Sequence, residues 1–316
     1  MRARLAAVTV LVTSVAIATL AVDAGGRPVR GAPDCRIFPR DNHWNVRVDR
    51  LPVAANSDAV VASIGLDDGM HADFGSGRYE GAPIGIPYTT VSKGQRRVPV
   101  SFDYADESDR GKYPIPANVP IEGGRSSDGD RHAIVVDRDR CRLYELYAAY
   151  PRDGGRSWHA GSGAKWSLSS NRLRRKGYTS ADAAGLPILP GLARYEELRK
   201  GIDHALRFTA SRTRRAYVYP ARHFASDLTD PDLPAMGQRL RLKAGFDVSG
   251  YPPQARAILI ALKRYGMILA DNGSDWYVSG SPSSGWDNDQ LHTLNQVEGR
   301  NFEVVDTSSV PRPRGG

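Results

Sequence analysis

Residues 131–150, with the sequence RHAIVVDRDRCRLYELYAAY, contain the clearest structural signal in the chain. Two runs rich in β-branched and aromatic residues flank the polar segment 137–140, which is typical of two antiparallel strands joined by a tight turn. If the turn is centred between positions 138 and 139, His132 lies opposite Glu145 on the neighbouring strand. Directly opposed side chains are close enough to form a hydrogen bond. This stretch therefore predicts a hairpin that brings an imidazole and a carboxyl group together.

Other parts of the chain carry the signals of short strands and of one substantial helix. A helix is predicted over residues 253–265, because two prolines precede it and Gly266 follows it. Its apolar residues recur at helical spacing: Ala255, Ile258, Leu259 and Leu262. Strands are predicted over residues 98–104, 158–168, 204–209, 216–219, 238–246, 267–270 and 276–278. Antiparallel strands with one substantial helix favour a mainly β fold, as in a β-sandwich or a jelly-roll-like body.

The N-terminus is typical of an export signal. Arg2 and Arg4 precede an uncharged apolar run over residues 5–22, and small residues lie just before Gly25. An uncleaved membrane anchor is the alternative interpretation. No later stretch is apolar enough to span a bilayer, so we expect a monomeric extracytoplasmic protein that has no membrane attachment after cleavage.

Composition along the rest of the chain favours a single folded domain. Residues 25–34 are rich in Gly, Pro and Arg and predict a short linker after the signal peptide of residues 1–24. Residues 35–307 contain no internal repeat and no long low-complexity break, so we expect one β-rich domain there. Residues 308–316 are predicted to form a flexible tail.

Two cysteines, Cys35 and Cys141, are the only ones in the sequence. Exported proteins with a small, even number of cysteines usually pair them, so a disulfide is expected here. Two buried free thiols are the alternative.

The sequence is basic, with 43 Lys and Arg against 35 Asp and Glu, which gives a formal charge of +8. The basic residues gather modestly in segments 172–176 and 212–215. A solvated rim explains such short runs, and attraction to an anionic polymer is the alternative. Nucleic-acid binding is not favoured, because no basic stripe is interleaved with aromatic residues.

Several well-known catalytic motifs are absent. The sequence has no Gly-x-Ser-x-Gly, no His-Glu-x-x-His, no phosphate-binding loop and no dinucleotide fingerprint. No metal site is predicted, because neither His71-Ala72-Asp73 nor the polar segment 287–292 matches a known ligand spacing. We therefore expect no cofactor, and structural calcium stays an open alternative.

Three residues are the candidate catalytic groups. Glu145 and Asp271 would act as a carboxyl pair, and His132 would tune Glu145 across the hairpin. Asp271 ends a hydrophobic run immediately before Asn272-Gly273, a strong hairpin signal. A buried ion pair that fixes the strand register is the alternative role for Glu145 and His132. Turn formation alone is the alternative for Asp271.

A further group of residues is suited to sugar binding, because indole faces stack on sugar rings and polar side chains bind hydroxyl groups. The candidates are Trp158, His159, Trp166, Asp182, His223 and Trp276. Together these features predict a secreted glycoside hydrolase that acts on a polysaccharide or another extracellular glycan. A polysaccharide lyase acting on an acidic glycan and a non-catalytic glycan-binding or envelope protein are the alternatives, and a secreted nuclease is weaker still.

Overall fold

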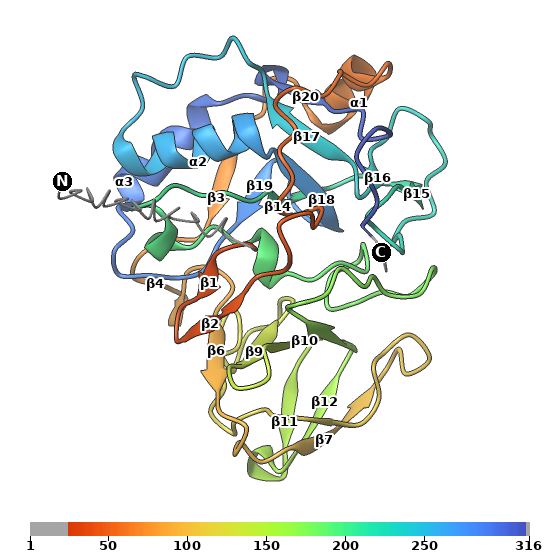
Figure 1. Cartoon of the computed structure of the whole chain (residues 1–316), viewed down its shortest axis with the longest axis vertical. Helices are drawn as coiled ribbons and strands as arrows, with labels where there is room; N and C mark the ends of the chain where they lie inside the picture. The colour runs from red at the N-terminus through yellow and green to blue at the C-terminus, as the bar shows by residue number, and fades with distance from the viewer. Residues whose placement is uncertain (1–24, 314–316) are drawn as a thin grey trace, which may run out of the picture.

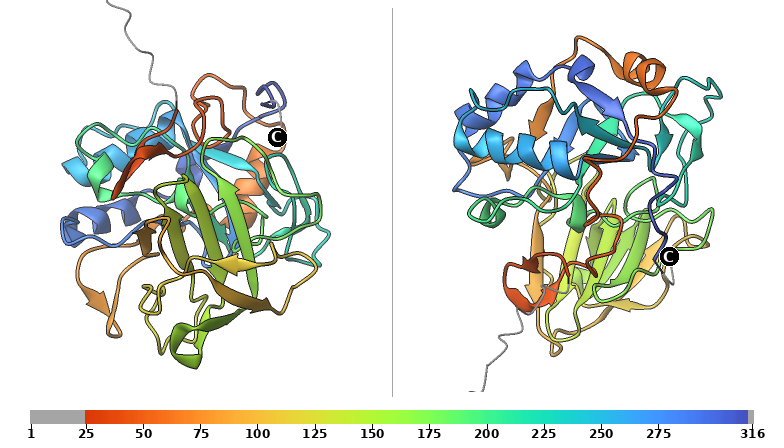
Figure 2. Two further views of the ribbon diagram at one scale, coloured as in Figure 1. Left: turned by 60° about the horizontal axis from the view of Figure 1, so that its bottom comes forward. Right: turned by 45° about the horizontal axis from the view of Figure 1, so that its top comes forward.

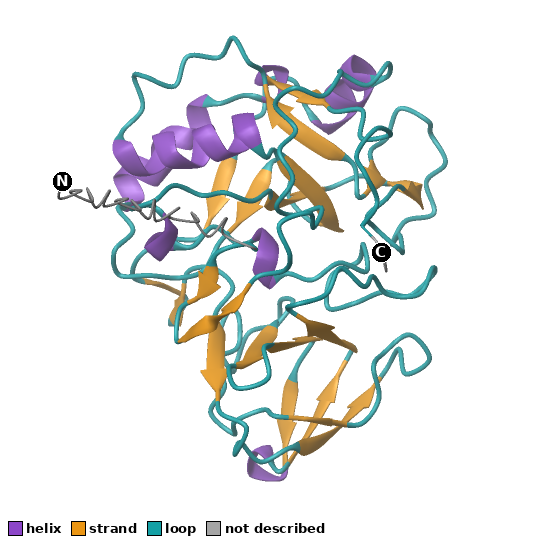
Figure 3. Cartoon of the chain, viewed as in Figure 1, coloured by secondary structure: helices purple, strands orange, loops and turns teal. Residues whose placement is uncertain are grey.

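The computed structural model describes residues 25–313 of the chain. Strands occur throughout the molecule, whereas the longer helices lie in its upper half (Figures 1 and 3). The mainly β prediction is therefore confirmed. The predicted signal peptide of residues 1–24 lies outside the described residues.

A four-stranded sheet lies in the middle of the molecule and has a hydrophobic core on each face. Its strand order is β13 (Ser162–Ser167), β10 (Arg142–Tyr147), β9 (Ala133–Asp137) and β6 (Tyr88–Val91). Successive side chains of a strand point to opposite faces. Accordingly, Ile134 and Val136 join the larger core, whereas Ala133 and Val135 join the smaller one. Burial on both faces explains why the apolar runs in 131–150 are nearly continuous.

The predicted hairpin is present in this sheet, but its predicted register is wrong. Val136 pairs with Leu143 and Ile134 pairs with Glu145, so the strands are offset by two residues from the expected pairing. The loop contains residues 138–141, and Cys141 adopts a left-handed conformation with φ of 47°. The loop is shifted by one residue toward the C-terminus from the predicted segment 137–140, and the strand pairing shifts with it. His132 consequently precedes β9 and does not lie opposite Glu145.

A second four-stranded sheet shares the smaller core. Its order is β11 (Tyr150–Arg152), β12 (Ser157–Ala160), β7 (Val98–Phe102) and β8 (Lys112–Tyr113). The single strand predicted over 158–168 is thus two strands, β12 and β13, in different sheets. The chain changes sheet at Gly161, where a Cβ atom would lie 2.6 Å from the ring of Tyr147. Glycine is required by that close approach.

The upper half contains a six-stranded mixed sheet. Its order is β20 (Phe302–Val304), β17 (Arg239–Leu242), β18 (Met267–Asn272), β14 (Leu206–Ala210), β19 (Tyr277–Ser279) and β3 (His71–Asp73). Strand β14 separates β18 from β19, so the hairpin expected at Asn272-Gly273 is wrong. The β14–β18 and β19–β3 pairs are parallel, unlike the antiparallel pairing that was expected.

Helix α2 (Pro253–Arg264) confirms the one substantial helix predicted from the sequence. All four of its periodic apolar residues are buried in the larger core. The other helices are short: α1 (Ser57–Ile64), α3 (Asn288–His292) and the 3₁₀ turns Asp153–Gly155, Leu189–Gly191, Tyr195–Glu197, Thr293–Gln296 and Gly299–Asn301. The remaining strands are β4 (Arg78–Tyr79), β5 (Ala82–Pro83), β15 (Arg214–Tyr217) and β16 (Ala235–Met236).

Residues 25–34 do not form the expected linker. They contribute to a hairpin of β1 (Pro28–Val29) and β2 (Ala32–Arg36), and Val29 and Ala32 are buried in the larger core. Figure 2 shows this hairpin in red close to the green strands of the middle sheet. The predicted disulfide between Cys35 and Cys141 is present and ties β2 to the loop between β9 and β10.

Candidate functional site

A cavity of about 380 Å³ lies where segments from both halves of the molecule meet. Strand β18 and the segment 179–183 contribute to its wall, and the loop after β7 and the end of β10 close it. The lining residues are Tyr104, Glu107, Asp130, Tyr147, Ser162, Thr179, Ser180, Ala181, Asp182, Ala183, His223, Ala225, Asp271 and Asn272.

A β-bulge positions Asp271 in this cavity. Phe208 of β14 pairs with Leu269 of β18, and the next residue, Thr209, pairs with Asp271. Ala270 is therefore an extra residue, and its carbonyl accepts a hydrogen bond from the Ala184 N–H at 2.8 Å. Bulges often redirect a side chain beside a functional site. Here the bulge directs a carboxyl group to the junction between β18 and the segment 179–183.

The Asp271 carboxyl group has an environment that favours its protonated form. Its side chain is 19% exposed, and its Oδ2 accepts a hydrogen bond from the Ala183 N–H at 3.2 Å. Burial and the nearby Asp182 carboxylate raise the pKa of Asp271 well above its ordinary value, although Arg207 opposes them. A carboxyl group with a raised pKa keeps its proton to higher pH and can donate it to a ligand.

Asp182 also lines the cavity, but its carboxylate is held by Arg207. The Arg207 Nε donates to Asp182 Oδ2 at 2.9 Å, and Nη2 donates to Oδ1 at 2.6 Å. A third bond runs from Nη1 to the Ser279 hydroxyl at 2.7 Å. Because both oxygens are bound in this fork, Asp182 is suited to positioning Arg207 and Asp271 rather than to proton transfer.

Glu107 and His223 also line the cavity, and both bind the segment 179–183. Glu107 Oε2 accepts a hydrogen bond from the Thr179 N–H at 2.9 Å and lies 3.8 Å from His223 Nε2. His223 Nδ1 lies 2.8 Å from the Ala183 carbonyl oxygen, to which it donates. That bond fixes the ring with Nε2 toward Glu107. Glu107 is 28% exposed, so its carboxylate is both anchored and reachable from the cavity.

Tyr104, Tyr147 and the Asp130 carboxylate also line the cavity. Tyr104 is 55% exposed. Burial raises the pKa of Tyr147, and the nearby charges of Asp130 and Asp271 raise it further. Asp130, Tyr147 and Asp271 all line the same cavity. Tyrosine faces can stack on sugar rings as tryptophan faces do.

His132 lies behind the cavity wall and pairs with Glu122, not with Glu145. Its Nδ1 lies 2.5 Å from Glu122 Oε2, and its Nε2 lies 3.0 Å from the Ala181 carbonyl oxygen. Both partners are acceptors, so the ring carries two protons. Burial lowers the pKa of His132, but the charge and hydrogen bond of Glu122 have the larger effect together and raise this pKa to about 9. His132 is 1% exposed and is therefore a structural imidazolium.

This pairing makes the stability of the protein depend on pH. Folding raises the pKa of His132 from its ordinary value of 6.5 to about 9. The stabilisation by the charged His132–Glu122 pair is therefore complete below pH 6.5 and is lost as pH rises through about 9. We expect the free energy of unfolding to fall by about 3 kcal/mol over this range, at about 1.4 kcal/mol per pH unit. Urea unfolding at pH 6.5 and 9.5 measures the fall. An equal fall in His132→Gln would contradict the assignment.

Glu145 does not reach the cavity. Its carboxyl group is fully buried and accepts hydrogen bonds of 2.9–3.0 Å from the backbone N–H groups of Ile188 and Leu189. Burial raises the pKa of Glu145 to about 7, although these bonds oppose the shift. The predicted catalytic role is corrected: with no ligand access, Glu145 anchors the turn at residues 188–189 against the middle sheet.

The three tryptophans predicted as stacking platforms are core residues. Trp158 belongs to the smaller core, whereas Trp166 and Trp276 belong to the larger one, and none is more than 4% exposed. Their indole faces are covered by protein and cannot stack on a ligand. His159 lies on β12 between Ser101 and Asp103, at 3.0 Å from each, and does not line the cavity.

Of the predicted site residues, the cavity brings together Asp182, His223 and Asp271. Sequence reasoning missed Tyr104, Glu107, Asp130 and Tyr147, and it missed Glu122 and Arg207 behind the wall. Glu107 and Asp130 lie in polar segments that resemble ordinary loops, so no local pattern marks them. Arg207 offered the best signal, as a charged residue inside the apolar strand predicted over 204–209.

Glu122, Asp130 and His132 form a group whose candidate ligand atoms lie within 4.8 Å of one another. Both His132 nitrogens already have acceptors, so binding a cation would require this ring to lose a proton and break its bond to Glu122. The group therefore fits a hydrogen-bonded ion pair better than a metal centre.

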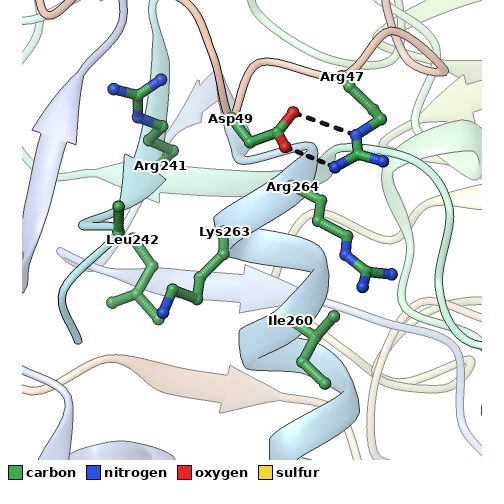
Figure 4. A pocket seen from close by; sticks show the side chains of 8 residues that line it. Arg47, Asp49, Arg241, Leu242, Ile260, Lys263 and Arg264 are labelled. Atoms are coloured by element: carbon green, nitrogen blue, oxygen red, sulfur yellow. Dashed lines mark hydrogen bonds and ion pairs between the residues drawn. The ribbon is translucent and has the colours of Figure 1, made fainter. Parts of the chain in front are cut away.

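A second hollow, of about 330 Å³, lies between α2 and β17 (Figure 4). It has a basic lining, but its charged groups are largely paired. Arg47 binds Asp49, Arg241 binds Glu303 at 2.7 Å, and Lys263 donates to a backbone carbonyl. These bonds leave little for a ligand, so the cavity around Asp271 is the stronger candidate.

No family model matches the chain, and searches of curated proteins and of solved structures likewise gave no match. Within residues 25–313, no helix combines the length and apolarity needed to cross a membrane. The chemistry of the cavity is therefore the main indication of what the protein does.

Proposed function

We propose that the protein is an exported glycoside hydrolase whose catalytic cavity is the one around Asp271. The observation that carries the proposal is a carboxyl group with a strongly raised pKa, partly exposed in a cavity that also contains an anchored carboxylate. Glycosidic hydrolysis uses one carboxyl group as an acid and a second as a base or nucleophile.

In this mechanism Asp271 donates its proton to the glycosidic oxygen as the bond to the anomeric carbon breaks. Glu107 accepts a proton from the water molecule that attacks that carbon, so the products are two sugars with free hydroxyl groups. The backbone N–H groups of Ala183 and Thr179 hold the two carboxyl groups in place. Tyr104 and Tyr147 would contact the sugar rings, in the role first assigned to the tryptophans.

Export and the disulfide agree with a polysaccharide substrate outside the cytoplasm. The proposal keeps Asp271 from the sequence prediction and replaces Glu145 with Glu107, because Glu145 has no access to the cavity.

A reducing-end assay of the purified protein against a panel of soluble polysaccharides tests the proposal. We expect hydrolysis that weakens as pH rises through the raised pKa of Asp271, because the acid must be protonated. New ultraviolet absorbance from unsaturated ends would instead indicate a lyase. Binding without any product after long incubation would contradict catalysis and favour a glycan-binding protein.

A further inference from the structure

The cavity differs in charge from the rest of the molecule. The chain carries a formal charge of +8, yet no residue in the described lining of this cavity is Lys or Arg. Four of the lining residues are acidic: Glu107, Asp130, Asp182 and Asp271. The Arg207 guanidinium lies behind the wall and is already bound to Asp182. The Arg174 guanidinium is bound to the Glu107 carbonyl oxygen and to Asp109. A uronic-acid polymer would therefore meet carboxylates with no free cation to balance its own charge.

Asp130 is the acidic residue best placed to bind a cation from solvent. It is exposed, and within residues 25–313 its side chain has no hydrogen-bond donor. A nitrogen of the His132 imidazolium lies within 4.8 Å of an Asp130 oxygen, but both of its N–H groups are taken by Glu122 and Ala181. The Asp130 carboxylate is thus only partly neutralised and is available to a ligand.

The aromatic residues beside Asp130 suit the same kind of ligand. Ala148, the residue after Tyr147, donates its N–H to the Asp130 carbonyl oxygen at 2.9 Å, and Tyr104 presents an exposed ring in the same lining. An ammonium group is attracted both to a carboxylate and to the face of a tyrosine ring. The sugar ring that carries it can contact these rings at the same time.

We infer that the cavity selects a polysaccharide with free amino groups, such as a polymer of glucosamine, by placing a sugar ammonium between Asp130 and the Tyr104 and Tyr147 rings. This inference rests on the proposed function for the position of the sugar beside Asp271 and Glu107. A substrate with free amino groups differs in charge from neutral glucans and from acidic glycans. The sequence alone could not choose among these three classes.

The test compares glucosamine oligomers with fully N-acetylated glucosamine oligomers of equal length, at pH 6, where free amino groups are charged. Both kcat/KM from reducing-end release and Kd from calorimetry are measured for the mature protein. We expect at least a tenfold preference for the free amine. Asp130→Asn should reduce this preference severalfold. Asp128→Asn should leave it unchanged, because Asp128 is exposed two residues away and lies outside the lining.

The outcomes separate this inference from the proposed function. Equal hydrolysis of both oligomers, or a preference for a uronate polymer, would overturn the inference while hydrolysis itself stood. Binding of glucosamine oligomers that depends on Asp130, with no product formed, would support the inference and contradict hydrolysis. A preference that persists in Asp130→Asn would overturn the assignment of Asp130.

Discussion

Asp271→Asn is expected to lower kcat on a hydrolysed polysaccharide by about 10²–10⁴-fold, the range that general acid catalysis contributes. Asparagine has nearly the same shape, but it cannot donate a proton to a leaving oxygen. It also has one accepting oxygen for the two backbone N–H groups, of Ala183 and Asn272, that bind the Asp271 carboxyl group. Because burial and Asp182 raise the pKa of Asp271, the uncharged amide resembles the form that this environment favours. The free energy of unfolding should fall by about 1 kcal/mol, because one backbone N–H loses its acceptor.

A matched substitution is available four residues along the chain. Asp275 lies outside the cavity lining, and its carboxylate accepts hydrogen bonds from the N–H and hydroxyl of Ser211. Asp275→Asn should retain kcat within a factor of about two. Activity in Asp271→Asn equal to that of Asp275→Asn would remove Asp271 from the mechanism.

Arg207→Met is expected to lower the free energy of unfolding by about 3–5 kcal/mol, because it leaves the buried Asp182 carboxylate without its cation. The two side chains are 5% and 0% exposed, and the pair shares three hydrogen bonds of 2.6–3.1 Å. Solvent therefore cannot replace the lost guanidinium. Urea unfolding at pH 7 measures the loss.

The double variant Asp182→Asn/Arg207→Met distinguishes an unpaired charge from a packing defect. A neutral pair of similar volume is often tolerated where a single charge is not, so we expect the double variant to recover much of the stability. If it is as unstable as Arg207→Met alone, the loss of stability comes from packing or from the bond to Ser279. The unpaired, buried carboxylate of Asp182 is then not its cause.

Local patterns predicted the elements of this fold better than their arrangement. The apolar periodicity of 253–265 depends only on which face of a helix is buried, and α2 confirmed it. The Asn272-Gly273 turn signal could not show that β14 would lie between β18 and β19, because that insertion comes from long-range pairing. The hairpin loop contains one left-handed residue, Cys141. Left-handed conformations are uncommon for residues other than glycine, so the sequence did not indicate one at this position.

The candidate site was only partly predictable for a similar reason. Asp271 was found because it ends an apolar run, and Asp182 because a carboxylate in an apolar loop needs a partner. Glu145 carried the same signal, an acid among apolar residues, but backbone N–H groups satisfy it in a closed interior. The sequence cannot distinguish a buried acid that anchors a turn from one that reaches a cavity.

A carboxyl-carbon NMR titration of the protein labelled at aspartate tests the central claim most directly. The account predicts one resonance, missing in Asp271→Asn, that titrates well above the ordinary aspartate pKa of 3.8. If the resonance absent from Asp271→Asn titrates at or below that value in the wild-type protein, Asp271 is ionised at neutral pH and the cavity has no acid there.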